Sequence, residues 1–389
     1  MISPDSTSLW FVAGETSGDA RAAEVMRALR EKRPGIVFLG AGGPRMQELA
    51  GRPFDNWTAQ AAVVGLWDVL RHYGYFKTKF QGMLADIKET RPSAVVLVDY
   101  PGFNLRLAKA LRKSGYRGKI LYYISPQVWA WNRGRIPKMA RILDLMICVF
   151  PFEAPMYEAS GLHTVFVGHP LLEALEQDKI PVPREPGLVG FFPGSREREV
   201  RRIFPVMIQV AEIIRREFPE VRFEAAAASE AHAQRMRALA GDIAVRAGTA
   251  HSLMQRATAG VVCSGTATLE AAFFGLPYCL VYNVSRPTFV FLKCILHVDM
   301  LGIVNILNNY RVNPPTDPRL PASPAPHVVR EFIAHNATPE AISNEVLRLL
   351  RDEAAREKLS RELLQITSEL DAHGASQRAA TALLQALGS

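Results

Sequence analysis

Short apolar runs alternate with helix-forming stretches through the first half of the chain, and this alternation restricts the fold more than any other feature. The runs are rich in Val, Ile and Leu and lack an in–out pattern, which is typical of strands buried on both faces of a parallel sheet. Helix candidates such as Ala20–Lys32 and Leu105–Lys113 lie between them. The runs are Leu9–Val12, Ile36–Leu39, Ala94–Val98, Ile120–Ile124, Leu145–Val149 and Val165–Val167.

The alternation restarts after a polar, proline-rich break at Glu176–Gly187, which we interpret as an interdomain linker. A chain of 389 residues is long enough for two cores. We therefore predict two Rossmann-like, doubly wound α/β domains, residues 1–175 and 188–365, joined by linker residues 176–187. Such domains bind ligands outside the carboxyl ends of their strands, here in the cleft between the domains. The later runs are Leu188–Phe192, Val221–Ala225, Ile243–Val245, Gly260–Val262 and Tyr278–Tyr282.

The C-terminal third contains two further segments. Asn308–Pro326 is rich in proline, and we predict a surface loop that is neither helix nor strand. The tail from Pro339 is predicted to be helical. Its last part, residues 366–389, contains the amphipathic stretch Ala375–Leu387, which we expect to pack back across a domain or onto a partner.

Composition indicates a soluble globular protein, with 48% hydrophobic and 22% charged residues. We expect no signal peptide, because Met1–Asp5 leads straight into a core-type strand. We expect no membrane span, because Lys293, His297 and Asp299 interrupt the most apolar stretch, Phe289–Leu307. The cysteines form no CxxC pair, which favours reduced thiols in a cytoplasmic protein. The histidines lack the spacing of a zinc site, so no metal is predicted. The cysteines are Cys148, Cys263, Cys279 and Cys294.

A net charge of +8 favours an anionic partner, either a membrane surface or a phosphorylated substrate, although a simple solubility bias would look the same. Nucleic acid is not predicted, since Lys and Arg are spread along the chain without a basic helix or an aromatic-basic RNA motif.

A small-residue turn follows the apolar run Ala259–Val262 and opens into a helix. Free N–H groups and the positive end of the helix dipole at Ser264, Gly265, Thr266 and Ala267 would bind an anion. One turn later, Glu270 could accept hydrogen bonds from the vicinal hydroxyls of a sugar. Phosphates and a ribose bound together indicate a nucleotide.

The turn Gly194-Ser195-Arg196 holds the corresponding place after the first run of the second domain. Arg196 carries a permanent charge beside a helix start, where a diphosphate could bind both. Alone this turn is a weak signal, but together with the Gly265 loop it is fairly specific. Other nucleotide signatures fail: the chain lacks GxxxxGK[ST] and GxSxG, and Arg45 replaces the last glycine of GxGxxG.

Two turns of the first domain carry carboxylates at strand ends. In Gly14–Asp19 the glycines permit close approach of a ligand, Glu15 should face the cleft, and Ser17 or Asp19 could cap the first helix. For Asp19, capping is the favoured role. Asp99 follows Val95–Val98, and partial desolvation there would raise its pKa and suit a general base. The alternative is a turn-forming Asp99 with Asn104 as helix cap.

An amphipathic segment with aromatic and basic residues suits a membrane interface or an acyl-chain groove, although an ordinary buried helix has the same pattern. Its apolar residues are Val63, Val64, Leu66, Trp67, Val69, Leu70, Tyr73 and Phe76.

Several ordered motifs together resemble the lipid-A-disaccharide synthases, glycosyltransferases of the GT-B fold. The likeness runs from about Leu9 to about Leu307 and resumes at Val328. The Ser-Pro-x-Val-Trp-Ala-Trp string is especially specific. The motifs are Gly14–Asp19, Ala41–Met46, Asp99–Asn104, Tyr123–Trp131, Val167–Pro170, Pro193–Arg196 and Ser264–Glu270.

The resemblance implies two facing domains and transfer of 2,3-diacylglucosamine from its UDP derivative to 2,3-diacylglucosamine 1-phosphate. The products are the β-1,6-linked disaccharide 1-phosphate and UDP. The family inverts at the anomeric carbon, needs no bound metal or other cofactor, and acts peripherally at the cytoplasmic face of the inner membrane. It can also form dimers by exchanging C-terminal segments.

Site roles follow from the same motif matches. Asp99 matches the candidate base, with Glu15 beside it, and Arg196 and the Gly265–Ala267 helix start would stabilise the leaving diphosphate. Asn305 matches an active-site asparagine, and the Val63–Phe76 segment matches the family's apolar patch. Acceptor or sugar binding is assigned to Ser17, Asp19, Asn104, Ser125 and Trp129.

The chain departs from the family pattern after Asn305. The proline-rich insertion Asn308–Pro326 replaces a short turn, and Ala334 stands where glutamine is common, so no nucleotide contact is carried over to Glu331. Two other functions stay open: a different GT-B enzyme, such as a UDP-sugar 2-epimerase or another glycolipid transferase, and a nucleotide-sugar-binding or membrane-associated scaffold without activity.

Overall fold

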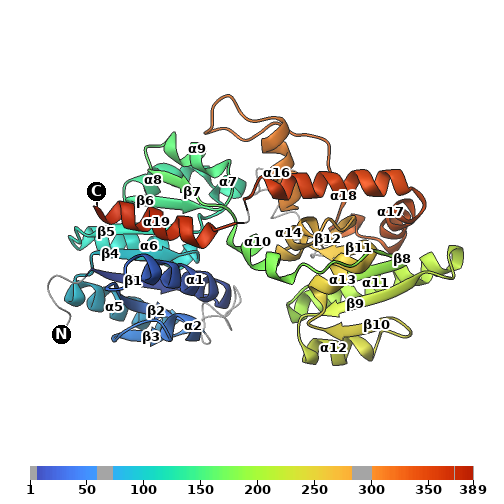
Figure 1. Ribbon diagram of the computed structural model, residues 1–389, viewed down its shortest axis with the longest axis horizontal. Helices are drawn as coiled ribbons and strands as arrows, with labels where there is room; N and C mark the ends of the chain where they lie inside the picture. The colour runs from blue at the N-terminus through green and yellow to red at the C-terminus, as the bar shows by residue number, and fades with distance from the viewer. Residues whose placement is uncertain (1–6, 59–72, 283–299, 372, 389) are drawn as a thin grey trace. The chain divides into compact units, whose positions relative to one another are not determined.

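The computed structural model describes residues 7–58, 73–282, 300–371 and 373–388. The chain divides into two compact units, residues 1–170 with 371–389, and residues 171–370. Each unit is built on its own parallel sheet, with helices packed against the strands (Figure 1). The predicted pair of α/β domains with parallel sheets is confirmed.

The described residues of the first unit form a seven-stranded sheet in the order β3-β2-β1-β4-β5-β6-β7, with every neighbouring pair parallel. Its central strands β1 and β4 are apolar apart from Ser8, and every residue of both is buried. The strands are β1 (Ser8–Ala13), β2 (Val37–Gly42), β3 (Phe54–Asn56), β4 (Ala94–Val98), β5 (Lys119–Tyr123), β6 (Leu145–Cys148) and β7 (Thr164–Phe166).

The second unit has a six-stranded sheet in the order β10-β9-β8-β11-β12-β13, again parallel throughout its described residues. Strand β11 is buried along its whole length at the centre of the core. The strands are β8 (Glu185–Phe192), β9 (Arg222–Ala227), β10 (Ala244–Ala247), β11 (Ala257–Cys263), β12 (Tyr278–Tyr282) and β13 (Glu331–Ile333).

Both sheets reverse their direction of winding between two central strands. In the first sheet β1 lies beside β4, and in the second β8 lies beside β11. The loops that leave the carboxyl ends of such a pair diverge, which opens a crevice where doubly wound sheets bind their ligands. The turns that carry Glu15, Asp99, Arg196 and Gly265 follow these four strands, whereas Ser125 and Trp129 follow β5 and Asn305 lies on α16.

Each predicted apolar run falls on a strand, whereas β3 and β13 were not predicted. Both are three-residue strands at a sheet edge, and none of their residues is fully buried. A strand covered on one side only needs no continuous apolar run, so neither segment carries that signal.

The helices connect the strands and cover the sheets (Figure 1). In the first unit they are α1 (Thr16–Lys32), α2 (Pro44–Gln47), α5 (Tyr73–Thr90), α6 (Pro101–Lys113), α7 (Val128–Trp131), α8 (Ile136–Ala140), α9 (Glu153–Glu158) and α19 (Ala375–Gly388). In the second unit they are α11 (Glu197–Glu217), α12 (Glu230–Arg237), α13 (Ala250–Arg256), α14 (Thr266–Phe273), α16 (Ile303–Val312), α17 (Pro339–Arg351) and α18 (Glu353–Ser368). Helix α10 (Pro170–Leu175) begins at the boundary between the units.

The prediction that Asn308–Pro326 lacks helix is wrong for its first five residues, because α16 continues through Val312. The first proline of the segment is Pro314, which disfavours helix only from the preceding residue onward. Asn313 still donates its N–H to the Asn309 carbonyl at 2.9 Å, so the helix closes normally before the prolines begin.

The C-terminal helix α19 packs against α1 of the first unit, which confirms that the tail folds back (Figure 1). Ala379, Ala380 and Leu383 are fully buried in that contact. The guanidinium of Arg378 donates to the Val167 carbonyl at 2.9 Å, and this bond fixes the start of the helix beside the sheet. Exchange of this helix with a partner stays a prediction.

Candidate functional site

The carboxyl edge of the first sheet presents two carboxylates, one after β1 and one after β4. Glu15 is exposed and precedes α1 in extended backbone, with no side-chain cap hydrogen bond. Asp99 and Tyr100 both have a φ of 46°, a left-handed conformation that non-glycine residues rarely adopt. Consecutive strained residues persist only where the surroundings enforce them, and they concentrate at functional sites.

A network of hydrogen bonds holds the Asp99 turn in this conformation. The carbonyl of Asp99 accepts from the Tyr122 hydroxyl at 2.5 Å and from the Asn104 amide at 2.8 Å. Its N–H donates to the Tyr123 carbonyl at 2.9 Å. Asn104, which is fully buried, also donates to the Val98 carbonyl. Asn104 therefore fastens the strand end to α6, and this contact gives it a supporting role.

The pKa of Asp99 is raised to about 6, chiefly by burial and then by the negative charge of Glu15, while the N–H of Tyr100 opposes the shift. A carboxylate with a pKa near neutrality can accept a proton from an alcohol and return it to solvent at the same pH. This turn therefore has the electrostatics of a general base.

Gly14 gives room to a side chain of the same chain. A Cβ at Gly14 would lie 2.3 Å from the ring of Tyr100. Tyr100 in turn belongs to an aromatic cluster with Trp57 and Phe103, whose ring centroids lie 4.9 Å apart. The glycine expected to admit a ligand instead lets the Tyr100 ring pack beneath the Glu15 turn.

Asp19 is buried and serves another helix. Its carboxylate accepts from the N–H groups of Gly43, Arg45 and Met46 at 2.9 to 3.1 Å. It thus caps α2, whereas the expected cap of α1 does not occur because Asp19 lies inside that helix. Ser17 is exposed in the first turn of α1.

The two acceptor candidates after β5 share one buried partner. Glu153, fully buried, accepts from the Ser125 hydroxyl at 2.6 Å and from the Trp129 indole at 2.9 Å. Burial raises the pKa of Glu153 to about 7, although these hydrogen bonds and that of the Phe150 N–H oppose the shift. The polar atoms of Ser125 and Trp129 thus organise their own loop. Sequence reasoning missed Glu153, because nothing local marks a glutamate that pairs with residues 24 and 28 positions away.

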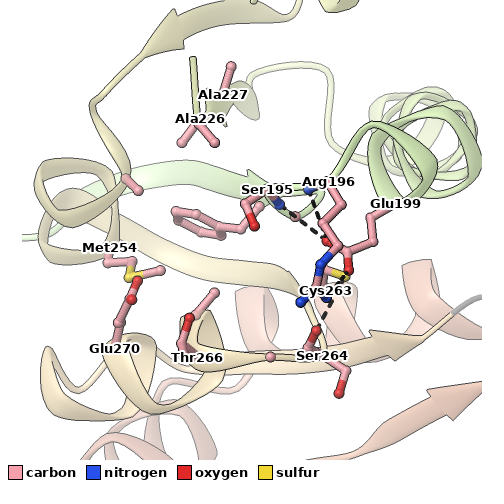
Figure 2. Close-up of a pocket in the computed structure, with 16 residues that line it drawn as sticks. Ser195, Arg196, Glu199, Ala226, Ala227, Met254, Cys263, Ser264, Thr266 and Glu270 are labelled. Atoms are coloured by element: carbon pink, nitrogen blue, oxygen red, sulfur yellow. Dashed lines mark hydrogen bonds and ion pairs between the residues drawn. The ribbon is translucent and has the colours of Figure 1, made fainter. Parts of the chain in front are cut away.

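The carboxyl edge of the second sheet encloses a cavity of about 400 Å³ between the β8–α11 and β11–α14 turns (Figure 2). This volume lies within the range of small-molecule sites. Every residue predicted from the sequence to bind UDP lines it. The lining is Phe192, Gly194, Ser195, Arg196, Glu199, Ala226, Ala227, Ala228, Ala250, Met254, Cys263, Ser264, Gly265, Thr266, Ala267 and Glu270.

Glu199 occupies the donors at the start of α11. Its carboxylate accepts from the N–H groups of Ser195 and Arg196, each at 3.2 Å, and from the Arg196 guanidinium at 3.0 Å (Figure 2). The arrangement shows that these donors bind an anionic group. Arg196 remains 82% exposed and can turn toward a ligand. Glu199 was not predicted, although its place three residues into the helix is the signature of a capping box.

The second turn leaves the start of α14 open. Gly265 has a φ of +146°, and a Cβ there would meet no atom within 4 Å. The hydroxyl of Thr268 donates to the Gly265 carbonyl at 2.7 Å, which braces the turn from below. The first N–H groups of a helix lack intrahelical partners, so the Gly265–Ala267 start can donate to an anion in the cavity.

Glu270 lies one turn further along α14 and lines the same cavity (Figure 2). His251 Nε2 of α13 lies 3.5 Å from its carboxylate. This histidine was not predicted, since 19 positions separate the two residues and no motif contains His251.

Asn305 is 2% exposed and does not line the cavity. Its side-chain oxygen accepts from the N–H groups of Val328 and Val329 at 2.9 and 3.0 Å. Its amide donates to Glu331 at 2.7 Å, and Glu331 also accepts from the backbone before α16. Asn305 and Glu331 therefore tie α16 to the strand β13.

Most of the predicted apolar patch lies outside the described residues, namely Val63, Val64, Leu66, Trp67, Val69 and Leu70. The side chain of Tyr73 is likewise not described. Phe76 packs edge-on against Trp57 at 6.2 Å, so this one residue of the segment belongs to the aromatic cluster beside Asp99.

No group of His, Cys, Asp and Glu side chains among the described residues has the arrangement of a metal site. None of the helices described is both long and apolar enough to cross a bilayer.

Two doubly wound parallel sheets, each with candidate site residues at its carboxyl edge, define the class of α/β proteins with paired Rossmann-like domains. Solved structures share this fold. The UDP-GlcNAc 2-epimerase from Neisseria meningitidis bound to UDP-GlcNAc covers 97% of this chain and 100% of its own, with a TM-score of 0.61 and 11% identity. A glycotransferase of kitacinnamycin covers 98% and 100%, with a TM-score of 0.57 and 16% identity. At these identities the likeness shows the fold.

The family follows from sequence. The model of the lipid-A-disaccharide synthetase family matches residues 9–318. A lipid-A-disaccharide synthase from Geobacter sulfurreducens is 35% identical over 400 aligned positions, which cover 100% of this chain and 99% of the relative. The chain belongs to the lipid-A-disaccharide synthetase family and is a glycosyltransferase.

Proposed function

We propose that this protein transfers 2,3-diacylglucosamine from UDP-2,3-diacylglucosamine to 2,3-diacylglucosamine 1-phosphate, forming the β-1,6-linked disaccharide 1-phosphate and UDP. The observation that most directly supports this proposal is that every predicted UDP-binding residue lines one cavity of the second unit. Membership of the lipid-A-disaccharide synthetase family supports the identity of the sugars.

In this proposal the reaction is a single inverting displacement. Asp99 takes the proton of the acceptor 6-hydroxyl, for which its pKa of about 6 is suited. The oxygen attacks the anomeric carbon as the bond to UDP breaks. Arg196 and the N–H groups at the start of α14 stabilise the charge that develops on the diphosphate.

The remaining assigned residues support these two groups. We propose that Glu15 raises the pKa of Asp99 and that Glu270 binds the ribose hydroxyls. Ser17 is proposed to contact the acceptor sugar, since it is exposed beside Glu15. Asp19, Asn104, Ser125, Trp129 and Asn305 are proposed to act through the loops that they hold in place.

The test is an assay with purified protein and both substrates, followed by mass spectrometry. Formation of the tetraacylated disaccharide 1-phosphate in step with UDP release is expected. The 2-epimerases of the same fold motivate the second candidate. UDP release or sugar isomerisation without acceptor would favour that candidate, and no turnover would favour a binding scaffold.

We also propose that the protein works at the cytoplasmic face of the inner membrane, where the Val63–Phe76 segment and a net charge of +8 would meet anionic lipid. Flotation with vesicles containing phosphatidylglycerol should recover the protein at low salt. Recovery unchanged by Trp67→Glu with Leu70→Glu would contradict the assigned surface.

Analytical ultracentrifugation separates a monomer from a dimer made by exchange of α19.

A further inference from the structure

His251 stands between two carboxylates in the second unit. Its Nδ1 lies 2.7 Å from Asp178 Oδ2, and its Nε2 lies 3.5 Å from Glu270 Oε2. The imidazole also packs against the ring of Phe274, with 5.6 Å between the centroids. Both ring nitrogens face acceptors, so the protonated ring can donate to both. The contact with Glu270 is the main cause that raises the pKa of His251.

The segment that carries Asp178 is fastened to α13. Gln255, one turn after His251, donates to the Asp178 carbonyl at 2.9 Å and accepts from the Ile180 N–H at 2.7 Å. Between them, Lys179 lies 4.5 Å over the ring of Phe273 on α14. Asp178 is therefore a fixed partner of His251, although it lies in a surface segment.

The far end of this chain of contacts is the cavity. Glu270 lines it, and its side chain is only 16% exposed. Its Oε2 faces His251, while Oε1 has no hydrogen bond or ion pair with any residue of the described ranges. A carboxylate held at one oxygen by an imidazole N–H is fixed in orientation and keeps acceptor capacity for a ligand.

We propose that His251 is a positioning residue that sets the preference of this cavity for a ribonucleotide over a nucleotide lacking ribose hydroxyls. The inference rests on the proposed function of the cavity as the UDP site. The contacts Asp178–His251–Glu270 hold the Glu270 carboxylate in the orientation that accepts hydrogen bonds from the 2′- and 3′-hydroxyls. Asp178 fixes the ring, and the ring fixes Glu270.

The test compares the dissociation constants of UDP and 2′,3′-dideoxy-UDP by calorimetry. Hydrogen bonds to a charged group are worth about 10- to 100-fold in affinity, so the wild-type protein should prefer UDP by about that factor. Glu270→Gln should remove most of this preference. His251→Asn should reduce it by about tenfold, with dideoxy-UDP binding nearly unchanged. The double variant should lose no more of the UDP preference than Glu270→Gln alone, because both substitutions act on one interaction.

His163→Asn, an exposed histidine in the first unit, is the control and should keep the full preference. If His251→Asn does not fold, Asp178→Asn is the alternative variant. It should also reduce the preference for UDP over 2′,3′-dideoxy-UDP. Wild-type preference in the His251 or Asp178 variant, or equal weakening of both ligands, would overturn the inference. A Glu270→Gln protein that still prefers UDP would overturn the ribose role itself, whereas failure of wild-type protein to bind UDP would count against the proposed function.

Discussion

Asp99 combines backbone strain, burial and a neighbouring like charge in one residue. Asp99 has a left-handed φ and a pKa of about 6. It follows the buried strand β4, which pairs with β1 at the switch point, and Glu15 follows β1. A residue that served only to turn the chain would need none of these. At the residue scale, these features support the proposal that Asp99 is the catalytic base.

Replacing Asp99 by Asn should lower kcat by about 10²- to 10⁴-fold, the usual contribution of a general base. UDP affinity should stay nearly unchanged, because the cavity proposed to bind UDP is lined by residues of the other unit. Steady-state kinetics and calorimetry measure the two effects separately. Equal losses for Asp99→Asn and for an exposed control, Glu89→Gln, would contradict the assignment of the base.

The same substitution should stabilise the protein above pH 7. The folded-state pKa of Asp99 is raised, so its stability contribution is present below pH 4 and is lost as pH rises through about 6. The shift from 3.8 to about 6 corresponds to a cost of roughly 3 kcal/mol at most. Thermal melts at pH 8 should give a higher Tm for Asp99→Asn, and the difference should shrink toward pH 4. A lower Tm at pH 8 would show that the carboxylate stabilises the fold.

The acid limb of the activity profile should follow Asp99, because a base works only when it is deprotonated. We expect kcat/KM to fall below about pH 6 in the wild-type protein. Glu15→Gln removes the like charge that helps to raise this pKa, so the limb should move to lower pH. A pH–rate profile checks this result, and a limb that stays in place would mean that Glu15 does not act on Asp99 by charge.

Arg196 is the residue of the second unit that we propose to contact the diphosphate. Arg196→Ala should weaken UDP binding about 10- to 100-fold and leave uridine binding nearly unchanged, because the guanidinium would contact the diphosphate alone. Calorimetry with both ligands measures this difference. Arg198→Ala, an exposed arginine on the same helix, is the matched control. Equal weakening of UDP and uridine would refute a diphosphate contact.

At the scale of elements, the turn between β8 and α11 depends on Gly194. Its φ is +107°, and a Cβ would lie 2.5 Å from Glu199 Oε2. Gly194→Ala should therefore destabilise the second unit and also displace Glu199 from the donors of the turn. Gly241→Ala is the matched control. Gly241 also has a positive φ, +59°, but a Cβ there would meet no atom within 4 Å, so the substitution adds backbone strain without a steric clash. Denaturant unfolding and UDP titration should show that only Gly194→Ala alters affinity, and equal effects would contradict a specific role for the turn.

The strands and the placement of the site turns could be predicted from sequence, whereas the partners of the site residues could not. Buried parallel strands such as β4 and β11 are continuous apolar runs, and the turns after them carry the functional residues because winding reverses there. The partners of Ser125, Asp19 and Glu270 lie 28, 24 to 27 and 19 residues away. Such pairings are set by tertiary packing and leave no periodic trace.

At the scale of the whole molecule, the first unit is completed by the last helix of the chain. Leu383 of α19 is fully buried against that unit. Leu383→Ala should destabilise it by about 2 to 5 kcal/mol, as expected for a buried leucine in a packed core. Calorimetric unfolding measures the loss, with the exposed Gln385→Ala as control. An unchanged melting profile would mean that α19 is not part of the first unit in solution.

The central claim is that the second unit holds the nucleotide at the two turns beside its switch point. A crystal structure of the protein with UDP tests this most directly. The account predicts the diphosphate within hydrogen-bonding distance of Arg196 and of the Gly265–Ala267 N–H groups, with the ribose hydroxyls on Glu270. Uridine diphosphate bound at any other place in the protein would contradict it.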